Sequence, residues 1–317
     1  MHGPPGASDV SIAVCAVFRN EAPYLAEWVE FHRLMGVEHF FLYDDRSIDG
    51  GRDVLGPYAN DGLVTLTGCT MPLGAGGQSW AYDDALSRAR GRFRWLAFID
   101  IDEFLFCPTA HPLPEVLSKF ENYPGVVVNW QVYGSSGHQA KPDGLVIESF
   151  TRRARSDWVR NRRVKSIIDP TRTVRSLGPH FFEHNPGELA VTENREPITT
   201  ARNSSARRRL RRVLARVPGV HVDPYAIRES SVRRVSVRCL RINHYAVRSR
   251  QEFADKLSRH AAEDPAADGT SRLQRGYFAY HDRNEIDDPI LVSHATRVHE
   301  RLALRPSPLR DGLGASH

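Results

Sequence analysis

The chain has 317 residues, of which 41% are hydrophobic and 26% charged, and its formal net charge is +5. The hydrophobic content supports a real core, which excludes a mainly disordered chain. The modest positive charge favours acidic ligands such as nucleotides, phosphates or anionic glycans, and it does not require a nucleic-acid partner.

The cysteines and the hydropathy pattern indicate a cytoplasmic protein. Cys15, Cys69, Cys107 and Cys239 are far apart and show no metal-binding spacing. We therefore expect them to be reduced, small apolar residues. The first residues lack the basic and apolar regions of a signal peptide, and no apolar run approaches the ~20 residues that cross a bilayer. Any membrane contact is expected to be peripheral, on the inner face of the membrane.

The first third of the chain alternates apolar strands with helices, and polar or acidic loops follow the strands. The expected strands are residues 11–18, 39–43, 63–66 and the run that begins at Trp95, and the expected helices are 22–36 and 78–89. This alternation predicts an α/β fold with a parallel sheet. Ligands bind in such folds beyond the carboxyl ends of the strands.

The most informative motif is the apolar run from Trp95 to Phe106, which contains Asp100, Asp102 and Glu103. Side chains two apart in an extended chain share a side, so Asp100 and Asp102 are expected to face one ligand. Carboxylate oxygens, completed by phosphate oxygens, suit a divalent cation. The alternative for an isolated Asp-x-Asp is an acidic turn that caps a helix. No Gly-Lys-Ser P-loop and no Gly-x-Gly-x-x-Gly after a strand is present, which disfavours P-loop and dinucleotide-binding proteins.

The remainder of the chain is expected to receive a second substrate. Strands are predicted at 126–130, 146–150 and 232–242, a helix with a capping box at 249–260, and a last helix from Asp288-Pro289. A basic surface helix is predicted at 201–217. A solvated insertion is the preferred interpretation of its run Arg207 to Arg212, and peripheral contact with an anionic membrane or acidic acceptor is the alternative.

Several motifs occur in a fixed order between Val14 and about Lys256. They include Phe18-Arg19-Asn20-Glu21-Ala22-Pro23, Tyr43-Asp44-Asp45-Arg46-Ser47, Phe98-Ile99-Asp100-Ile101-Asp102-Glu103, Gly134-Ser135-Ser136-Gly137-His138, Lys165-Ser166-Ile167 and His244-Tyr245-x-x-Arg248-Ser249-x-x-Glu252-Phe253-x-x-Lys256. Together they resemble glycosyltransferase family 92. The resemblance implies a GT-A fold, which is a single Rossmann-like mixed sheet flanked by helices, here with added C-terminal helices.

The resemblance also implies a domain plan and a reaction. One domain would cover 10–305, with a nucleotide-sugar-binding half at 10–110 and an acceptor-binding half at 111–305, between a disordered N-terminus at 1–9 and a flexible tail at 306–317. The reaction would be the metal-dependent, inverting transfer of a hexose, with galactose favoured, from a UDP-sugar to a glycan or glycosylated acceptor. The metal would be Mn²⁺ or Mg²⁺. The Arg- and Ala-rich, Lys-poor composition further suggests a bacterial source.

Metal binding is assigned on the same resemblance. Asp102 would bind the cation directly, and Asp100 would reach it through water or contact the donor ribose. His244 would return to the metal or the diphosphate, with a packed core imidazole as the alternative. Glu103 would orient the acidic pair or begin a helix.

Donor binding is expected at the ends of the first two strands. Asn20, Glu21 and Asp44 would hold uracil and ribose. The alternative for Asn20 and Glu21 is N-capping of the next helix, which can coexist with donor binding, and the alternative for Asp44 is an Asx turn shared with Ser47. The other candidate donor contacts are Arg19 at a phosphate, Gln78 after the Gly-rich loop, and Lys256, for which a surface lysine is the alternative.

An inverting transfer needs a base beside the acceptor hydroxyl. Glu183 and His180 are ranked narrowly first for this role, within a polar segment that follows the predicted strands. His138 and Trp158 are the acceptor-pocket candidates, although loop packing explains a histidine, and core packing a tryptophan, about as well. Two other classes remain open: a nucleotidyltransferase acting on a sugar phosphate, and a noncatalytic glycan-binding protein.

Overall fold

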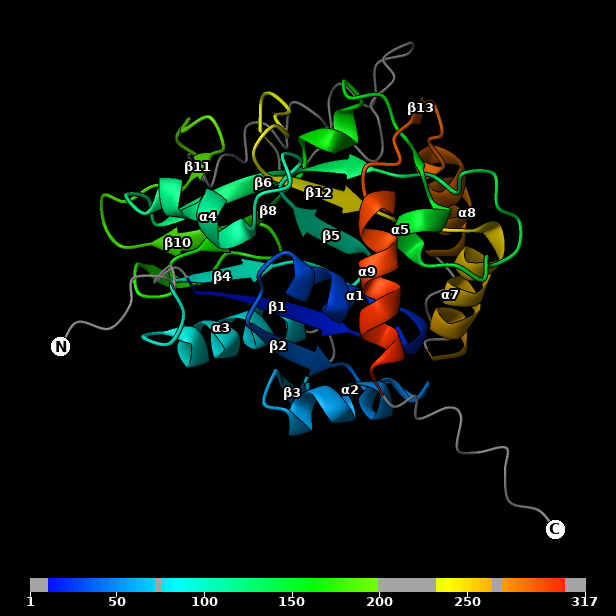
Figure 1. The fold of residues 1–317 in the computed structure, drawn as a ribbon, viewed down its shortest axis with the longest axis horizontal. Coiled ribbons are helices and arrows are strands. Elements are labelled where there is room, and N and C mark those ends of the chain that lie inside the picture. Colours follow the sequence, from blue (N-terminus) through cyan, green and yellow to red (C-terminus); the bar gives the residue numbers. More distant parts are fainter. Residues whose placement is uncertain (1–10, 72–75, 199–231, 264–269, 306–317) are drawn as a thin grey trace.

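The computed structural model describes residues 11–71, 76–198, 232–263 and 270–305, and one mixed sheet runs through its centre (Figure 1). Four neighbouring strands are parallel: β3 (Val64–Gly68), β2 (His39–Asp44), β1 (Ile12–Phe18) and β4 (Trp95–Phe98). The sheet continues through β8 (Val164–Ile168), β6 (Gly125–Val132), β12 (Arg241–His244) and β5 (Glu103–Phe106), of which only the β6–β12 pair is parallel. β11 (Val191–Thr192) adds to β6.

Helices cover both faces of this sheet. They are α1 (Ala22–Leu34), α2 (Gly51–Asn60), α3 (Gly77–Ala89), α4 (Leu113–Leu117), α5 (Val146–Ser149), α7 (Arg250–Glu263), α8 (Thr270–His281) and α9 (Val292–Ala303). Two small ribbons pair β9 (Thr173–Ser176) with β10 (Phe182–His184), and β7 (Arg152–Arg153) with β13 (Ile286–Asp287). The predicted fold class, a GT-A fold on one Rossmann-like mixed sheet with added C-terminal helices, is confirmed.

Strand β1 is buried on both sides because its side chains alternate between two cores. Val14 and Ala16 join the core that includes α1, whereas Ala13 and Cys15 join the core that includes α3. This explains why the strand is an unbroken apolar run in the sequence. The strands predicted at 11–18, 39–43, 63–66 and 126–130 and the helices at 22–36 and 78–89 are confirmed, with ends shifted by one or two residues. All four cysteines are unpaired.

The prediction of a strand at 146–150 is wrong, because Val146–Ser149 forms the short helix α5. A buried carboxylate explains the difference. Glu27 of α1 accepts hydrogen bonds from the backbone N–H groups of Val146 and Ile147, at 2.8 and 3.0 Å. It thus satisfies two of the donors that a helix start leaves unpaired. A segment of five residues, three of them apolar, is too short for periodicity alone to distinguish a helix from a strand.

Only the end of the strand predicted at 232–242 exists, since β12 begins at Arg241. The buried carboxylate of Glu193 accepts hydrogen bonds from the backbone N–H groups of Arg238, Cys239 and Leu240. Those groups therefore cannot join a sheet ladder. The last helix also begins later than predicted, at Val292 rather than at Asp288.

The predictions of a disordered N-terminus at 1–9, a basic helix at 201–217 and a flexible tail at 306–317 concern residues outside the described ranges. Within the described ranges, none of the helices combines the length and apolar character needed to cross a bilayer.

His32 of α1 is a buried, neutral histidine that links a helix to the sheet. Its Nδ1 donates to the carbonyl of Trp28 at 2.8 Å, and its Nε2 accepts from the backbone N–H of Leu105 at 3.0 Å. Burial lowers the pKa of His32 from 6.5 to about 3, against a smaller opposing effect of the bond to Trp28. The folded protein therefore binds fewer protons than the unfolded chain between these pH values.

We expect the free energy of unfolding to fall as the pH drops from about 6.5 to about 3, by up to about 1.4 kcal/mol per pH unit from this histidine. Urea denaturation at a series of pH values measures the slope. His32→Gln should be less stable at pH 7 and should show a shallower slope. An unchanged slope in that variant would contradict the role assigned to His32.

Candidate functional site

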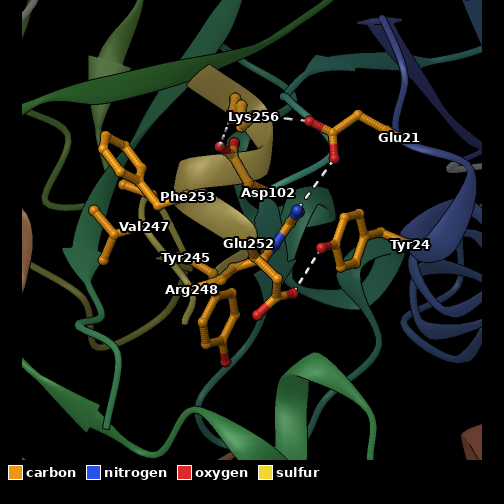
Figure 2. A pocket seen from close by; sticks show the side chains of 10 residues that line it. Glu21, Tyr24, Asp102, Tyr245, Val247, Arg248, Glu252, Phe253 and Lys256 are labelled. Carbon is orange, nitrogen blue, oxygen red and sulfur yellow. Dashed lines mark hydrogen bonds and ion pairs between the residues drawn. The ribbon is translucent and has the colours of Figure 1, made fainter. Parts of the chain in front are cut away.

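A small polar pocket lies where three segments meet: the start of α1, the turn after β4, and the chain from β12 into α7 (Figure 2). Its lining residues are Glu21, Tyr24, Asp102, Tyr245, Ala246, Val247, Arg248, Glu252, Phe253 and Lys256. Because β1 and β4 are parallel, the loops that follow them reach the same edge of the sheet. The pocket therefore occupies the predicted location, beyond the carboxyl ends of the parallel strands.

The Asp-x-Asp motif forms a tight turn between β4 and β5. β4 ends at Phe98, and the N–H of Glu103 donates to the carbonyl of Asp100 at 3.0 Å. The indole N–H of Trp28 holds the turn by donating to the carbonyl of Glu103 at 2.8 Å. The expectation that Asp100 and Asp102 share one side assumed an extended chain, and it fails because the chain turns between them.

The two aspartates consequently have different partners. The Asp100 carboxylate accepts a hydrogen bond from the buried ammonium of Lys165 at 2.7 Å. Asp102 instead lies beside His244 and Lys256, with Oδ1 3.6 Å from the His244 Nε2 and Oδ2 3.7 Å from the Lys256 Nζ. Burial alone would raise the pKa of Asp102, but His244, Lys256 and Arg248 together hold it well below its usual range. Asp102 is therefore a carboxylate at neutral pH.

His244 is positioned by the end of β12. The N–H of the next residue, Tyr245, donates to the carbonyl of Asp102 at 2.8 Å, which fixes the two segments together. The His244 ring packs on Trp130 with ring centroids 4.3 Å apart. The ring nitrogen Nδ1 is buried and has no hydrogen-bond partner among the described residues.

A second group of charges surrounds Arg248. Its Nη1 lies 3.1 Å from the Oε2 of Glu21, whose other oxygen is 3.8 Å from the Lys256 Nζ. The Arg248 guanidinium carbon lies 3.4 Å from the ring centroid of Tyr24, and the Tyr24 hydroxyl donates to Glu252 at 2.6 Å. These contacts join the first loop of the chain to α7, as the dashed lines in Figure 2 show.

Asp102 and His244 fit part of a metal site. A carboxylate and an imidazole 3.6 Å apart are donors of kinds that a divalent metal accepts. In the ranges that the structure describes, no group of three His, Cys, Asp or Glu side chains converges, and Asp100 is occupied by Lys165. The predicted set of Asp102, His244 and Asp100 is therefore not brought together. A cation here would need further ligands from a bound diphosphate or water.

The predicted nucleoside contacts at the strand ends have local partners. The Asn20 side chain accepts from the N–H of Ile48, and Asp44 accepts from the N–H of Ser47 and from Arg52. Burial alone would raise the pKa of Asp44, but Arg52 and Ser47 hold it below its usual range. These bonds shape the loops after β1 and β2. Of the predicted donor contacts, Glu21, Lys256 and the metal residue Asp102 line the pocket, whereas Asn20 and Asp44 do not.

Two further residues that were predicted to contact the sugar donor, Arg19 and Gln78, do not line the pocket. Arg19 is 3.6 Å from Asp45, and Gln78 donates to the hydroxyl of Tyr82 at 3.2 Å.

The base candidates do not line this pocket. Glu183 lies on β10, pairs with Arg175 at 2.6 Å and borders a separate cavity. His180 is buried with its Nδ1 2.8 Å from the carbonyl of Val164. Burial, aided by the charge of Lys165, lowers the pKa of His180 to about 3, which makes it a weak base.

The acceptor candidates both make packing contacts. The His138 Nε2 is 3.0 Å from the carbonyl of Ser149. The Trp158 ring packs against Tyr280, with centroids 5.3 Å apart, and lies under the Arg283 guanidinium. Neither residue lines the Asp102 pocket.

Arg248, Tyr24 and Lys165 were assigned no role from the sequence, although Arg248 and Lys165 lie within the motifs described above. The one available signal was Lys165, a lysine at the start of an apolar strand, because an isolated charge in such a run needs a buried partner. The contacts between Tyr24 and α7 had no sequence signal. They join residues more than two hundred positions apart.

An acidic turn and basic side chains meet at the carboxyl edge of the parallel strands, which is the edge where α/β proteins of this class bind their ligands. The chain belongs to glycosyltransferase family 92, whose family model matches residues 8–241. The match includes the Asp100–Asp102 turn and ends before His244, Arg248 and Lys256.

Plant proteins are among the relatives. The family 92 protein Os08g0121900 of Oryza sativa subsp. japonica is 32% identical over 163 residues, which are 50% of this chain and 27% of that protein. The galactan beta-1,4-galactosyltransferase GALS3 of Arabidopsis thaliana is 31% identical over 116 residues, 34% of this chain and 23% of that one. The chain thus matches about a quarter of the length of each. These relatives give no support to a bacterial source.

Solved structures resemble parts of the fold. S. aureus TarS 1-349 in complex with UDP has a TM-score of 0.35 and 13% identity, covering 51% of this chain and 47% of that one. Glucosyl-3-phosphoglycerate synthase from Mycobacterium tuberculosis, in complex with Mn²⁺, UDP and glucosyl-3-phosphoglycerate, has a TM-score of 0.27 and 16% identity. The match covers 40% of this chain and 49% of that one. Overlaps of this size carry no functional information about this chain.

Proposed function

We propose that this protein is a metal-dependent, inverting glycosyltransferase that moves a hexose from a UDP-sugar to a glycan or glycosylated acceptor. The observation that carries the proposal is the ionised Asp102 at the carboxyl edge of the sheet, where it lines a pocket together with Lys256 and lies beside His244. Membership of glycosyltransferase family 92 supports the reaction class. The partial likeness to a galactan beta-1,4-galactosyltransferase supports galactose as the sugar.

The charges of the pocket suit a leaving diphosphate. Asp102 and His244 would hold Mn²⁺ or Mg²⁺, which supplies positive charge to the departing diphosphate when bound. Lys256 is half-buried and lies against both Asp102 and Glu21, so a cation at Asp102 would free its ammonium for a phosphate oxygen. Trp28 fixes the backbone that carries Asp102, which keeps the carboxylate in place during the reaction.

The proposal also gives Asp100, which does not line the pocket, a role in donor binding. The Asp100 side chain is partly exposed, and the oxygen that does not contact Lys165 would accept a hydrogen bond from a hydroxyl of the sugar donor. The base is not assigned to Glu183 or His180 in this proposal, because neither lines the pocket.

A product analysis tests the proposal. UDP-galactose and UDP-glucose are incubated with the protein, with Mn²⁺ or with EDTA, and the released nucleotide is identified by chromatography. We expect Mn²⁺-dependent release of UDP, with galactose as the preferred sugar. Pyrophosphate release from UTP and a sugar phosphate would instead identify a nucleotidyltransferase. Metal-independent glycan binding without turnover would identify a binding protein.

A further inference from the structure

Arg248 has features that its contacts within the chain leave unexplained. Its side chain is only 7% exposed, and its Nε and Nη2 are buried without a hydrogen-bond partner among the described residues. Unpaired buried donors cost free energy, and a guanidinium costs more than a neutral group. A bound ligand, ion or water that pairs with such a group is one explanation for its persistence in a native protein.

The backbone at Arg248 is also unusual. Its φ of 51° lies in the left-handed region, which non-glycine residues rarely adopt and which favours asparagine over arginine. This conformation occurs between β12 and α7, immediately before Ser249. Residues held in such conformations cluster at ligand-binding sites, where the surrounding structure fixes them.

The side chain is held rigidly from two sides. The Tyr24 ring stacks on the guanidinium at 3.4 Å, and Glu21 pairs with Nη1 at 3.1 Å. Tyr24 is itself fixed by its hydrogen bond to Glu252, and Glu252 is fixed by hydrogen bonds from Ser249. The unpaired edge of the guanidinium, with Nε and Nη2, is therefore presented in one orientation.

Resting on the proposed function, we infer that Arg248 binds the diphosphate of the nucleotide-sugar donor through Nε and Nη2. A guanidinium edge offers two parallel N–H donors that match two phosphate oxygens. Arg248 and Asp102 line the same pocket, so a diphosphate bound by the arginine would lie near the carboxylate that would hold the cation. Lys256 is a flexible point charge at 38% exposure and cannot supply this fixed geometry.

Calorimetric titration of the full chain with UDP and with UMP, in the presence of Mn²⁺, tests the inference. UMP keeps the nucleoside and lacks the second phosphate. We expect Arg248→Met to weaken UDP binding by about 10- to 100-fold and UMP binding by much less, because hydrogen bonds to charged groups are lost. Arg250→Met is the matched control. Arg250 is exposed two positions away, and its replacement should change neither affinity.

Arg248→Lys covers the case in which Arg248→Met does not fold. It keeps the positive charge beside Glu21 and loses the two-donor edge, so it should retain the wild-type melting temperature and still lose most of the preference for UDP over UMP. Equal losses for UDP and UMP, or wild-type UDP affinity in a folded variant, would overturn the role of Arg248 alone. Wild-type protein that binds no UDP would overturn the proposed function as well.

Discussion

Replacing Asp102 with asparagine is expected to reduce sugar transfer from the donor by at least about 10²- to 10³-fold, the usual effect of removing one group that stabilises developing charge. Asp102 is the ionised carboxylate of the pocket, and asparagine keeps its shape while removing its charge. The variant can no longer hold a divalent cation beside His244. We expect the loss in kcat rather than in folding.

Initial rates at saturating donor and Mn²⁺, together with a melting curve, measure both quantities. Asp53→Asn is the matched control, because Asp53 is exposed on α2 and away from the pocket lining. It should transfer sugar at the wild-type rate. A folded Asp102→Asn protein with wild-type activity would refute the proposed role of Asp102.

Lys165→Met is expected to destabilise the protein by about 3–5 kcal/mol, the usual cost of leaving a buried charge without its partner. The Lys165 ammonium is 1% exposed and lies 2.7 Å from Asp100 and 3.5 Å from the fully buried Glu103. Burial alone would lower the pKa of Lys165, but the two carboxylates raise it. Methionine fills the same space without the charge.

Urea denaturation of Lys165→Met measures this cost, with Lys119→Met on the exposed surface as the control. A second substitution provides a further check. Burial raises the pKa of Glu103, so Glu103→Gln should recover part of the lost stability in the Lys165→Met background by removing the unpaired acid. A difference of less than about 1 kcal/mol between the free energies of unfolding of Lys165→Met and wild type, which is about fivefold in the folding equilibrium, would contradict this role of Lys165.

The sheet could be predicted from the sequence because its central strands are buried on both faces. β1 and β4 are continuous apolar runs, and a polar residue follows each of them within two positions. The errors occurred where a distant carboxylate decides the local backbone. Glu27 stabilises the helix at 146–149 by accepting hydrogen bonds from its first N–H groups. Glu193 accepts hydrogen bonds from the N–H groups that would otherwise have extended β12. Neither carboxylate is near these segments in the sequence.

The candidate site was predictable to a similar extent. The positions of the strand ends and the motifs predicted that Glu21, Asp102, His244 and Lys256 lie close together. In the structure Glu21, Asp102 and Lys256 line one pocket, and His244 contacts Asp102. The different partners of Asp100 and Asp102 were not predictable from alternation, because a turn replaces the extended chain. The role of Arg248 depends on which of its nitrogens are paired, and only atomic positions show that.

The central claim is that Asp102 and His244 hold a divalent cation against a nucleoside diphosphate. Anomalous diffraction at the manganese edge, from crystals grown with Mn²⁺ and UDP, tests it most directly. The account predicts one strong peak between the Asp102 carboxylate and the His244 ring, in contact with the UDP diphosphate. UDP bound with no manganese peak at Asp102, or with the peak on other residues, would contradict it.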